Sequence, residues 1–233
     1  NRKGTIINYI KKNTPDIIGM QEVLNNQLIE LDSSLDDYAF VGVGREDGKT
    51  KGEYSPIFFK PSKLKLIKSD TFWLSETPDK VSVGWDAALE RICTYALFEQ
   101  INTKKNFLVF NTHFDHIGEN ARSESAKLIL KKIKKINRNK LPTLITGDFN
   151  LTPETKPMKI FKNNFNDVME SSDFENTYNG TYTGFNVNKN PTRRIDYIFE
   201  KDFQVKKAKH LLIKTSKGLW ASDHHPVFLS CYL

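Results

Sequence analysis

The feature that most constrains the fold is a series of short apolar segments that each carry reactive polar residues at one end. In one group these residues come last, as in DIIGMQE (16–22) and TLITGDFN (143–150). In another group they come first, as in RIDYIF (194–199) and SDHHPVFL (222–229). If the two groups form strands that run in opposite directions, all of these ends meet on one rim. The sequence therefore predicts largely antiparallel sheets with a single site at their edge.

Helical patterns interrupt the apolar segments. They predict helices near 3–12, 25–35, 119–138 and 154–163, between strands bounded by Gly, Pro and Asn. This mixed order favours an α/β layered sandwich over strict βαβ repetition. The 233 residues, 38% of them hydrophobic, contain no low-complexity linker and no fixed-period repeat. We therefore expect one domain over residues 1–233.

The net charge of +7 is compatible with a polyanionic partner. Much of it comes from residues 127–140, where Ile129, Ile133 and Ile136 follow helical spacing and most lysines fall elsewhere on the helix. A solvated helix face is a simpler interpretation of these lysines than a nucleic-acid stripe. Basicity alone therefore does not identify a partner.

Two further features exclude whole classes of protein. Cys93 and Cys231 lie far apart in apolar contexts, which fits neither a disulfide scaffold nor a set of zinc ligands. No apolar stretch approaches the roughly 20 residues that a membrane helix needs, so we expect a soluble chain without a transmembrane segment. The compartment is left open, and we expect a monomer.

The predicted rim collects oxygen-rich and basic side chains. Crowded carboxylates repel one another unless a cation offsets their charge, and oxygen ligands without cysteine pairs favour Mg²⁺ or Mn²⁺ over zinc. Histidines beside such a centre can donate to phosphate oxygens or carry protons near neutral pH, and an arginine fork suits a phosphate. The candidates are Glu22, Glu53, Arg91, His113, Asp148, Asn150, Asp196, Asp223 and His224.

Local spacing adds a prediction about side-chain direction. Asp148 and Asn150 would project to a common face if extended conformation persists past the strand end. Phe114 and Phe149, which alternate with the reactive residues, would then point toward apolar packing.

The chain has no G-x-S-x-G elbow, Walker loop, H-E-x-x-H or C-x-x-C. Serine hydrolases, P-loop motors and zinc hydrolases therefore lack their motifs here. GVGRED (42–47) is interpreted as a turn between strands.

Five motifs, in order, resemble the motif series of the endonuclease/exonuclease/phosphatase superfamily. They are DIIGMQEV, NTHFDH, TGDFN, RIDYIF and SDHHPV, and the match extends from about residue 16 to 229. Each one alone is weak evidence, whereas five in this order and spacing are strong. The intervening GVGREDG, GEYSPIFF and DTFWLSETPD look most similar to a bacterial branch of unassigned substrate. The resemblance implies a four-layered α/β/β/α sandwich with two mixed, largely antiparallel sheets.

The resemblance also implies a metal-assisted reaction. Glu22 would be the principal ligand of Mg²⁺ (or Mn²⁺), with Asp223 near the same cation. Asp148 and Asn150 would orient the attacking water and hold a phosphate oxygen or a second metal, so Asp148 is also a candidate ligand. His224 would contact the scissile phosphate, oriented and charged by Asp196.

Three more roles follow from the same resemblance. His113 would contact the phosphate from the other side, and Glu53 matches the acid that braces this histidine in the deoxyribonuclease branch. Arg91 matches a phosphate-contacting arginine there. His225 is expected to support packing rather than the reaction.

Family members open with a strand that ends in a metal-holding Asn, whereas this sequence opens with the helical pattern NRKGTIINYI. We therefore expect residues 1–233 to be one catalytic domain without that first strand.

The function that these predictions favour is divalent-metal-dependent hydrolysis of phosphoester bonds by in-line attack of water. A phosphodiesterase or nuclease, with a phosphoester substrate that includes nucleic acid, is favoured slightly. A phosphomonoesterase, or a phospholipid or inositol-phosphate phosphatase, using the same site is the alternative. A catalytically silent binding module is a third hypothesis, which the presence of all the matched acids and histidines disfavours.

Overall fold

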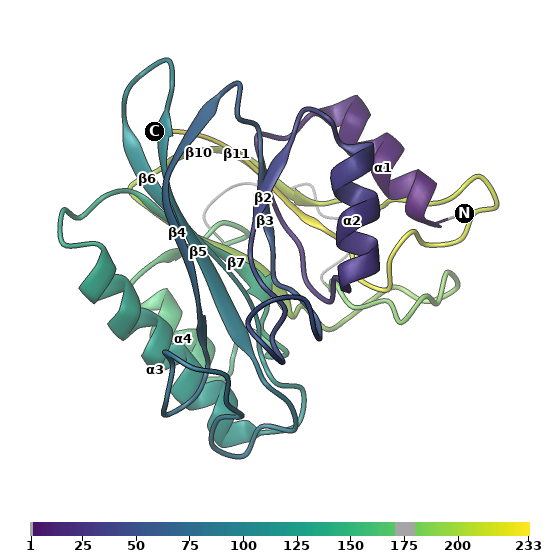
Figure 1. The fold of residues 1–233 in the computed structure, drawn as a ribbon. Helices are drawn as coiled ribbons and strands as arrows, with labels where there is room; N and C mark the ends of the chain where they lie inside the picture. Colours follow the sequence, from purple (N-terminus) through teal and green to yellow (C-terminus); the bar gives the residue numbers. More distant parts are fainter. Residues whose placement is uncertain (1, 171–179) are drawn as a thin grey trace.

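The computed structural model describes residues 2–170 and 180–233, which form a layered α/β structure (Figure 1). Its four helices are α1 (Arg2–Asn13), α2 (Asn25–Ser34), α3 (Glu119–Ile136) and α4 (Lys156–Lys162). Helices α3 and α4 lie together on one side of the strands, and α1 and α2 lie on the other. All four predicted helices are confirmed, with boundaries that differ by a few residues.

A six-stranded sheet forms the larger β layer. Its order is β4-β5-β6-β7-β9-β8, and only the central pair β6–β7 is parallel. Helix α3 connects this pair, as a parallel connection requires a long crossover. The strands are β4 (Leu64–Trp73), β5 (Ile92–Gln100), β6 (Asn106–His113), β7 (Thr143–Asp148), β8 (Asn166–Asp167) and β9 (Asp196–Lys201).

The second β layer consists of two small antiparallel sheets. One has the order β1-β3-β2, and the other pairs β10 with β11. The mixed sandwich is confirmed, but this layer is divided, because β1 and β11 are edge strands that do not pair with each other. The strands are β1 (Ile17–Gly19), β2 (Ala39–Val41), β3 (Ile57–Phe59), β10 (Gln204–His210) and β11 (Val227–Tyr232).

Three hydrophobic cores separate the four layers. The largest joins α3 and α4 to one face of the six-stranded sheet, the second lies between the two β layers, and the third joins the small sheet to α1 and α2. Strand β3 shows the period of two that this stacking requires: Ile57 and Phe59 enter the middle core, and Phe58 enters the helical one. The reactive strand ends are thus held between two buried faces.

The surface and the cysteines follow the sequence prediction. In α3, Ile129 and Ile133 are buried while Lys127, Lys131 and Lys134 are exposed, so the lysine-rich segment is a solvated helix face. Both cysteines are free. None of the helices in the described ranges is both long enough and apolar enough to pass through a bilayer.

A buried ion pair fastens the short edge strand β8 to the segment before β9. Arg194 Nη1 and Nη2 donate to Asp167 Oδ1 and Oδ2 at 2.9 and 2.7 Å. The Asp167 side chain is only 1% exposed, whereas Glu170, a second partner of Arg194, is 50% exposed. Asp167 should therefore contribute more than Glu170 to the attachment of Arg194.

We predict that Asp167→Ala lowers the free energy of unfolding by about 3 kcal/mol or more, because it leaves a buried guanidinium without its partner. Glu170→Ala, the matched control, should cost less than about 1 kcal/mol. Urea unfolding of both variants measures the difference. Equal losses would contradict the assignment.

Candidate active site

The register of three adjacent strands builds the floor of the site. His113, at the end of β6, lies opposite Asp148, at the end of the parallel strand β7. Asp196, at the start of the antiparallel strand β9, is the partner of Asp148 on the other side. Strand ends of opposite direction therefore meet on one rim, as the sequence predicts, and place an imidazole and two carboxylates in a row.

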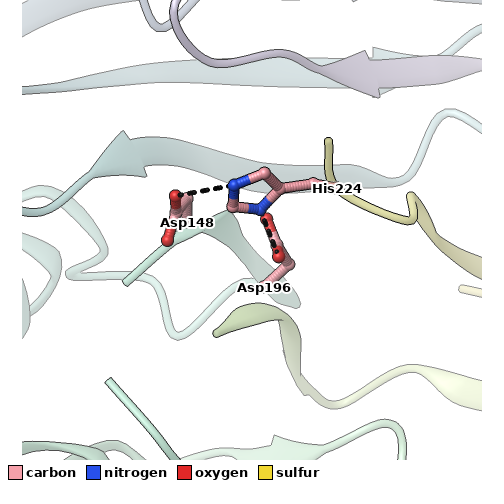
Figure 2. A group of neighbouring side chains, drawn as sticks. All are labelled: Asp148, Asp196 and His224. Carbon is pink, nitrogen blue, oxygen red and sulfur yellow. Dashed lines mark hydrogen bonds and ion pairs between the residues drawn. The ribbon is translucent and has the colours of Figure 1, made fainter. Parts of the chain in front are cut away.

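His224 comes to this row from the segment before β11. Its Nδ1 lies 2.8 Å from Asp196 Oδ2, and its Nε2 lies 3.9 Å from Asp148 Oδ2 (Figure 2). Burial alone would lower the pKa of His224, but the hydrogen bond and charge of Asp196 and the charge of Asp148 raise it to about 9. The imidazolium form of His224 is thus favoured at neutral pH, with Asp196 on one side of the ring and Asp148 on the other.

Asp148 is the most deeply placed acid of the group, with 5% of its surface exposed. Desolvation, and then the neighbouring charge of Asp196, raise its pKa to about 7. The backbone N–H of Asn150 donates to Asp148 Oδ1 at 2.8 Å. A carboxyl that is neutral and ionised in comparable amounts near pH 7 can accept or release a proton there.

Asn150 reaches the site through a turn, not through continued extended chain. Its φ is +50°, in the left-handed region, so the prediction that extended conformation brings Asp148 and Asn150 to one face is wrong in its geometry. The hydrogen bond from the Asn150 backbone N–H to Asp148 Oδ1 closes this turn. Phe114 and Phe149 do point into apolar packing, with ring centroids 4.9 Å apart.

His113 faces the same centre from the other side. Its Nε2 lies 3.6 Å from Asp148 Oδ2, 3.9 Å from Glu22 Oε1 and 3.2 Å from Asn150 Nδ2. Burial, followed by the charges of Arg91 and other nearby cationic groups, lowers the pKa of His113 well below 6.5. The two histidines are therefore in different charge states at neutral pH, one neutral and one protonated.

The predicted metal ligands Glu22 and Asp223 are less buried than Asp148, and the Glu22 side chain is 60% exposed. Partial burial, then the charges of Glu53 and Asp223, raise the pKa of Glu22, so these acids are close enough to repel. Asp148, Asp196 and His224 form the compact group, with ligand atoms all within 4.8 Å of one another. Among the described residues, Glu22, Asp223 and Asp148 do not form an equally compact group. A bound cation would offset the repulsion between these carboxylates, so an oxygen-rich site for a divalent cation fits these residues.

Glu53 and Arg91 occupy positions behind the rim. Glu53 Oε2 lies 2.5 Å from Arg45 Nη1, and no hydrogen bond joins Glu53 to His113 among the described contacts. Arg91 is buried, and its Nε and Nη2 are engaged by Asp115 and His116 at 3.3 and 2.9 Å. Asp115 therefore orients Arg91 rather than facing the reaction centre.

Residues 181–183, which the sequence does not predict as part of the site, hold the site together. Thr181 Oγ1 accepts the backbone N–H groups of Ile195 and Asp196, and Thr183 donates to the Asp223 carbonyl from both its backbone and its hydroxyl. The Tyr182 ring packs edge-on against His224, with centroids 5.1 Å apart. Small hydroxyl residues between turns give no sequence signal strong enough to find this role.

His225 has the supporting role that the sequence predicts. Its backbone N–H donates to the Thr181 carbonyl, and its ring packs edge-on against Trp220 at 4.5 Å. The side chain is 2% exposed, and burial lowers its pKa to about 4. Of the two adjacent histidines, His224 thus lies in the candidate site and His225 lies in the core.

Comparison with known proteins identifies the family. A sequence model of the Endonuclease/Exonuclease/phosphatase family matches residues 1–224. The chain belongs to this family. A solved mannosyl-6-phosphatase from Bacteroides thetaiotaomicron is 39% identical and superimposes with a TM-score of 0.94, over 100% of this chain and 91% of that one. Members of the endonuclease/exonuclease/phosphatase family are hydrolases that act on phosphoesters, and the family depends on divalent metals.

Two curated relatives are more distant. An uncharacterised protein of Acanthamoeba polyphaga mimivirus is 31% identical over 178 residues, which are 73% of this chain and 66% of that protein. A probable RNA exonuclease of Saccharomyces cerevisiae is 28% identical over 170 residues, 67% of this chain and 33% of that protein. The chain thus spans just under two thirds of the first relative and a third of the second.

The His224–Asp196 contact gives a direct prediction for this member of the endonuclease/exonuclease/phosphatase family. In Asp196→Asn the imidazolium loses its carboxylate partner while burial remains, so the pKa of His224 should fall from about 9 toward or below 6.5. Histidine NMR titration of the metal-free protein measures it. Asp202→Asn, at an exposed turn, should leave the midpoint in place, and an unshifted midpoint in Asp196→Asn would contradict the assignment.

Proposed function

We propose that this chain is a divalent-metal-dependent phosphoester hydrolase that works by in-line attack of water on phosphorus. The observation that carries the proposal is the row His113, Asp148 and Asp196 with His224 above it, within a family of phosphoester hydrolases. The surroundings of these residues push the pKa values of the acids and the histidines apart, which is a common arrangement for proton transfer near neutral pH.

Asp148 and Asn150 are the groups proposed to hold the attacking water. As the water oxygen bonds to phosphorus, Asp148 accepts its proton, and the bond from phosphorus to the leaving oxygen breaks, with the electron pair going to that oxygen, which then takes a proton from solvent. The raised pKa of Asp148 suits this acceptor role, because a base with a pKa near the working pH combines availability with driving force.

His224 is proposed to donate from Nε2 to a phosphoryl oxygen, with Asp196 fixing the ring through Nδ1. Its elevated pKa keeps that proton in place at neutral pH. His113, which is neutral, would donate to a second oxygen, and these fixed donors favour the charge that develops in the transition state. Arg91 is buried behind His113 and adds positive potential there, and direct contact with substrate stays a proposal.

Glu22 and Asp223 would hold Mg²⁺ or Mn²⁺, whose charge would offset the negative charge that builds up on the phosphoryl and leaving oxygens, and Asp148 would stay free to accept the proton. The elevated pKa of the crowded Glu22 supports a cation at this side. The alternative compact group that includes His224 and Asp196 is less suited, because these two side chains are already committed to each other at 2.8 Å.

For the substrate, we propose a phosphate monoester of a small polar molecule such as a sugar. This revises the slight preference for a nuclease that the motifs alone gave. The support is the 39% identity, over the whole chain, to a protein described as a mannosyl-6-phosphatase. Two of the similar proteins have a named activity, the mannosyl-6-phosphatase and the probable RNA exonuclease. The exonuclease is less similar, with 28% identity over 67% of this chain.

A phosphodiester is the second candidate. Tyr182, which is 40% exposed, packs against His224, and the Arg193 guanidinium lies over the Tyr182 ring, 5.8 Å from the ring centroid. An exposed aromatic ring beside the reaction centre can stack on a base, and a nearby guanidinium can contact a phosphate.

A substrate panel separates the candidates. With Mg²⁺ or Mn²⁺ present, we expect turnover of hexose 6-phosphates to exceed that of single-stranded RNA, single-stranded DNA and a small phosphodiester, and chelator should abolish it. Release of inorganic phosphate or of nucleotides measures each activity. Faster cleavage of nucleic acid, with rates that fall steeply with salt, would favour the nuclease.

Variants test the assigned residues. His224→Ala and Asp148→Ala should each lower kcat by at least about a hundredfold, the scale of one proton-transfer or charge-stabilising group. Lys207→Ala, on the exposed face of β10, is the control and should keep normal turnover. Folding is checked by thermal melting, and a folded His224→Ala protein with near-normal kcat would reject the role of His224.

A further inference from the structure

A buried amide joins the floor of the site to the chain that leads into Glu22. Asn111 lies in β6, two residues before His113, and is 0% exposed. Its Nδ2 donates to the Met20 carbonyl at 2.7 Å and to the Pro56 carbonyl at 2.9 Å. The six-stranded sheet is thereby fastened to the residue that follows β1 and to the residue that precedes β3.

The oxygen of the same amide is also fully used. Gln21 Nε2 donates to Asn111 Oδ1 at 2.7 Å, and the Thr146 hydroxyl of β7 lies 2.9 Å from it. That hydroxyl is farther from the Phe110 carbonyl, at 3.2 Å. An asparagine amide offers two donors and two acceptor positions, so with Thr146 as a donor all four are satisfied. Because both partners of Nδ2 are carbonyls, which only accept, their chemistry fixes the orientation of the amide.

Gly19, the last residue of β1, permits this network. A Cβ atom at position 19 would lie 2.5 Å from Thr146 Oγ1 and 2.8 Å from Asn111 Oδ1. Both distances are well below the roughly 3.5 Å of ordinary van der Waals contact, so a side chain there would force the network apart. The glycine of DIIGMQE is thus explained by the close approach of the two β layers beneath the site.

Glu22 follows this anchored segment in an unusual backbone conformation. Its φ is +59°, in the left-handed region that residues other than glycine seldom adopt. Such a conformation persists where surrounding contacts over-determine it. On one side the Asn111 network holds the two preceding residues. On the other side the Tyr54 N–H donates to the Val23 carbonyl at 2.8 Å.

We propose that Asn111 is a positioning residue for Glu22. Its amide network keeps Glu22 in the left-handed turn and so aims the carboxylate at the rim, where Oε1 lies 3.9 Å from His113 Nε2. Asn111 acts through the chain and does not touch the substrate. The consequence for cation binding rests on the proposed function, in which Glu22 is a ligand of Mg²⁺ or Mn²⁺.

The conformation of Glu22 is tested in the full chain without metal or substrate. The NMR ¹³Cα shift and the three-bond HN–Hα coupling of Glu22 both depend on φ. Thr146→Val removes one hydroxyl from the network at nearly constant shape, and Asn111→Ala removes all four hydrogen bonds. We expect both values to move away from those of the wild type, and farther in Asn111→Ala. If Asn111→Ala does not fold, Thr146→Val decides the test alone.

A matched control separates positioning from a general loss of stability. Thr94→Val, in β5 of the same sheet, removes a buried hydroxyl that lies 3.1 Å from the Thr71 hydroxyl. Its urea midpoint should fall about as far as that of Thr146→Val, because each variant loses one hydrogen bond. The shift and coupling of Glu22 should nevertheless keep their wild-type values in Thr94→Val.

Titration with Mn²⁺ alone measures the consequence for the cation. Residues that orient a metal ligand typically change metal affinity by about ten- to a hundredfold when they are replaced. We therefore expect Mn²⁺ to bind about tenfold more weakly to Thr146→Val, and more weakly still to Asn111→Ala. Thr94→Val should bind Mn²⁺ as the wild type does.

Two outcomes would overturn the proposal: wild-type values for Glu22 in a folded Thr146→Val protein, or equal changes in Thr94→Val. The NMR measurement needs neither metal nor hydrolysis. A Glu22 conformation that depends on the network, in a protein that neither binds Mn²⁺ nor cleaves phosphoesters, would support the positioning role and reject the proposed function. A shifted Glu22 with unchanged Mn²⁺ affinity would support the positioning role and reject Glu22 as a ligand.

Discussion

The alignment of β6, β7 and β9 is the constraint on which the site depends. The hydrogen-bond ladders of these strands fix His113, Asp148 and Asp196 as successive partners across the sheet. A slip of one residue would turn each of these side chains to the opposite face. The sheet also has aromatic cores on both sides, so its register is specified by packing as well as by backbone pairing.

This arrangement forces charges into a confined space and makes their environments unequal. Asp148 is desolvated, His224 is tied to Asp196, and His113 is buried near two arginines. Each protonation state is therefore set by neighbours that belong to different segments of the chain. The guanidinium groups of Arg45 and Arg91 are buried beside this histidine and are held by Glu53, Asp115 and His116.

The sequence predicted the parts of the fold that depend on local pattern. Helical spacing located α1 to α4, and the polar ends of apolar segments located the rim. The contact between Asp196 and His224 came from the family resemblance, since these residues are 28 positions apart and the sequence between them contains no local signal of their meeting. The left-handed turn at Asn150 was missed because extended conformation was assumed beyond the end of β7.

Other features depend on long-range geometry. Glu53 has a flexible side chain that could reach either His113 or Arg45, and only the folded loop places it beside Arg45. The role of residues 181–183 arises from threonine hydroxyls that bond to backbone groups distant in the sequence, and such hydroxyls are common in turns without this role. The division of the second β layer involves strands of three residues, too short for a periodicity to specify how they pair.

The alternation of reactive and aromatic residues at the end of β7 has a consequence for how this enzyme can change. Phe149 is anchored among buried rings while its neighbours Asp148 and Asn150 serve the rim. Inserting or deleting one residue here would exchange the two sets, putting a carboxylate in the core and a phenyl ring in solvent. Changes of length, and with them new substrate preferences, should therefore accumulate in the connecting loops, while this segment keeps a fixed number of residues.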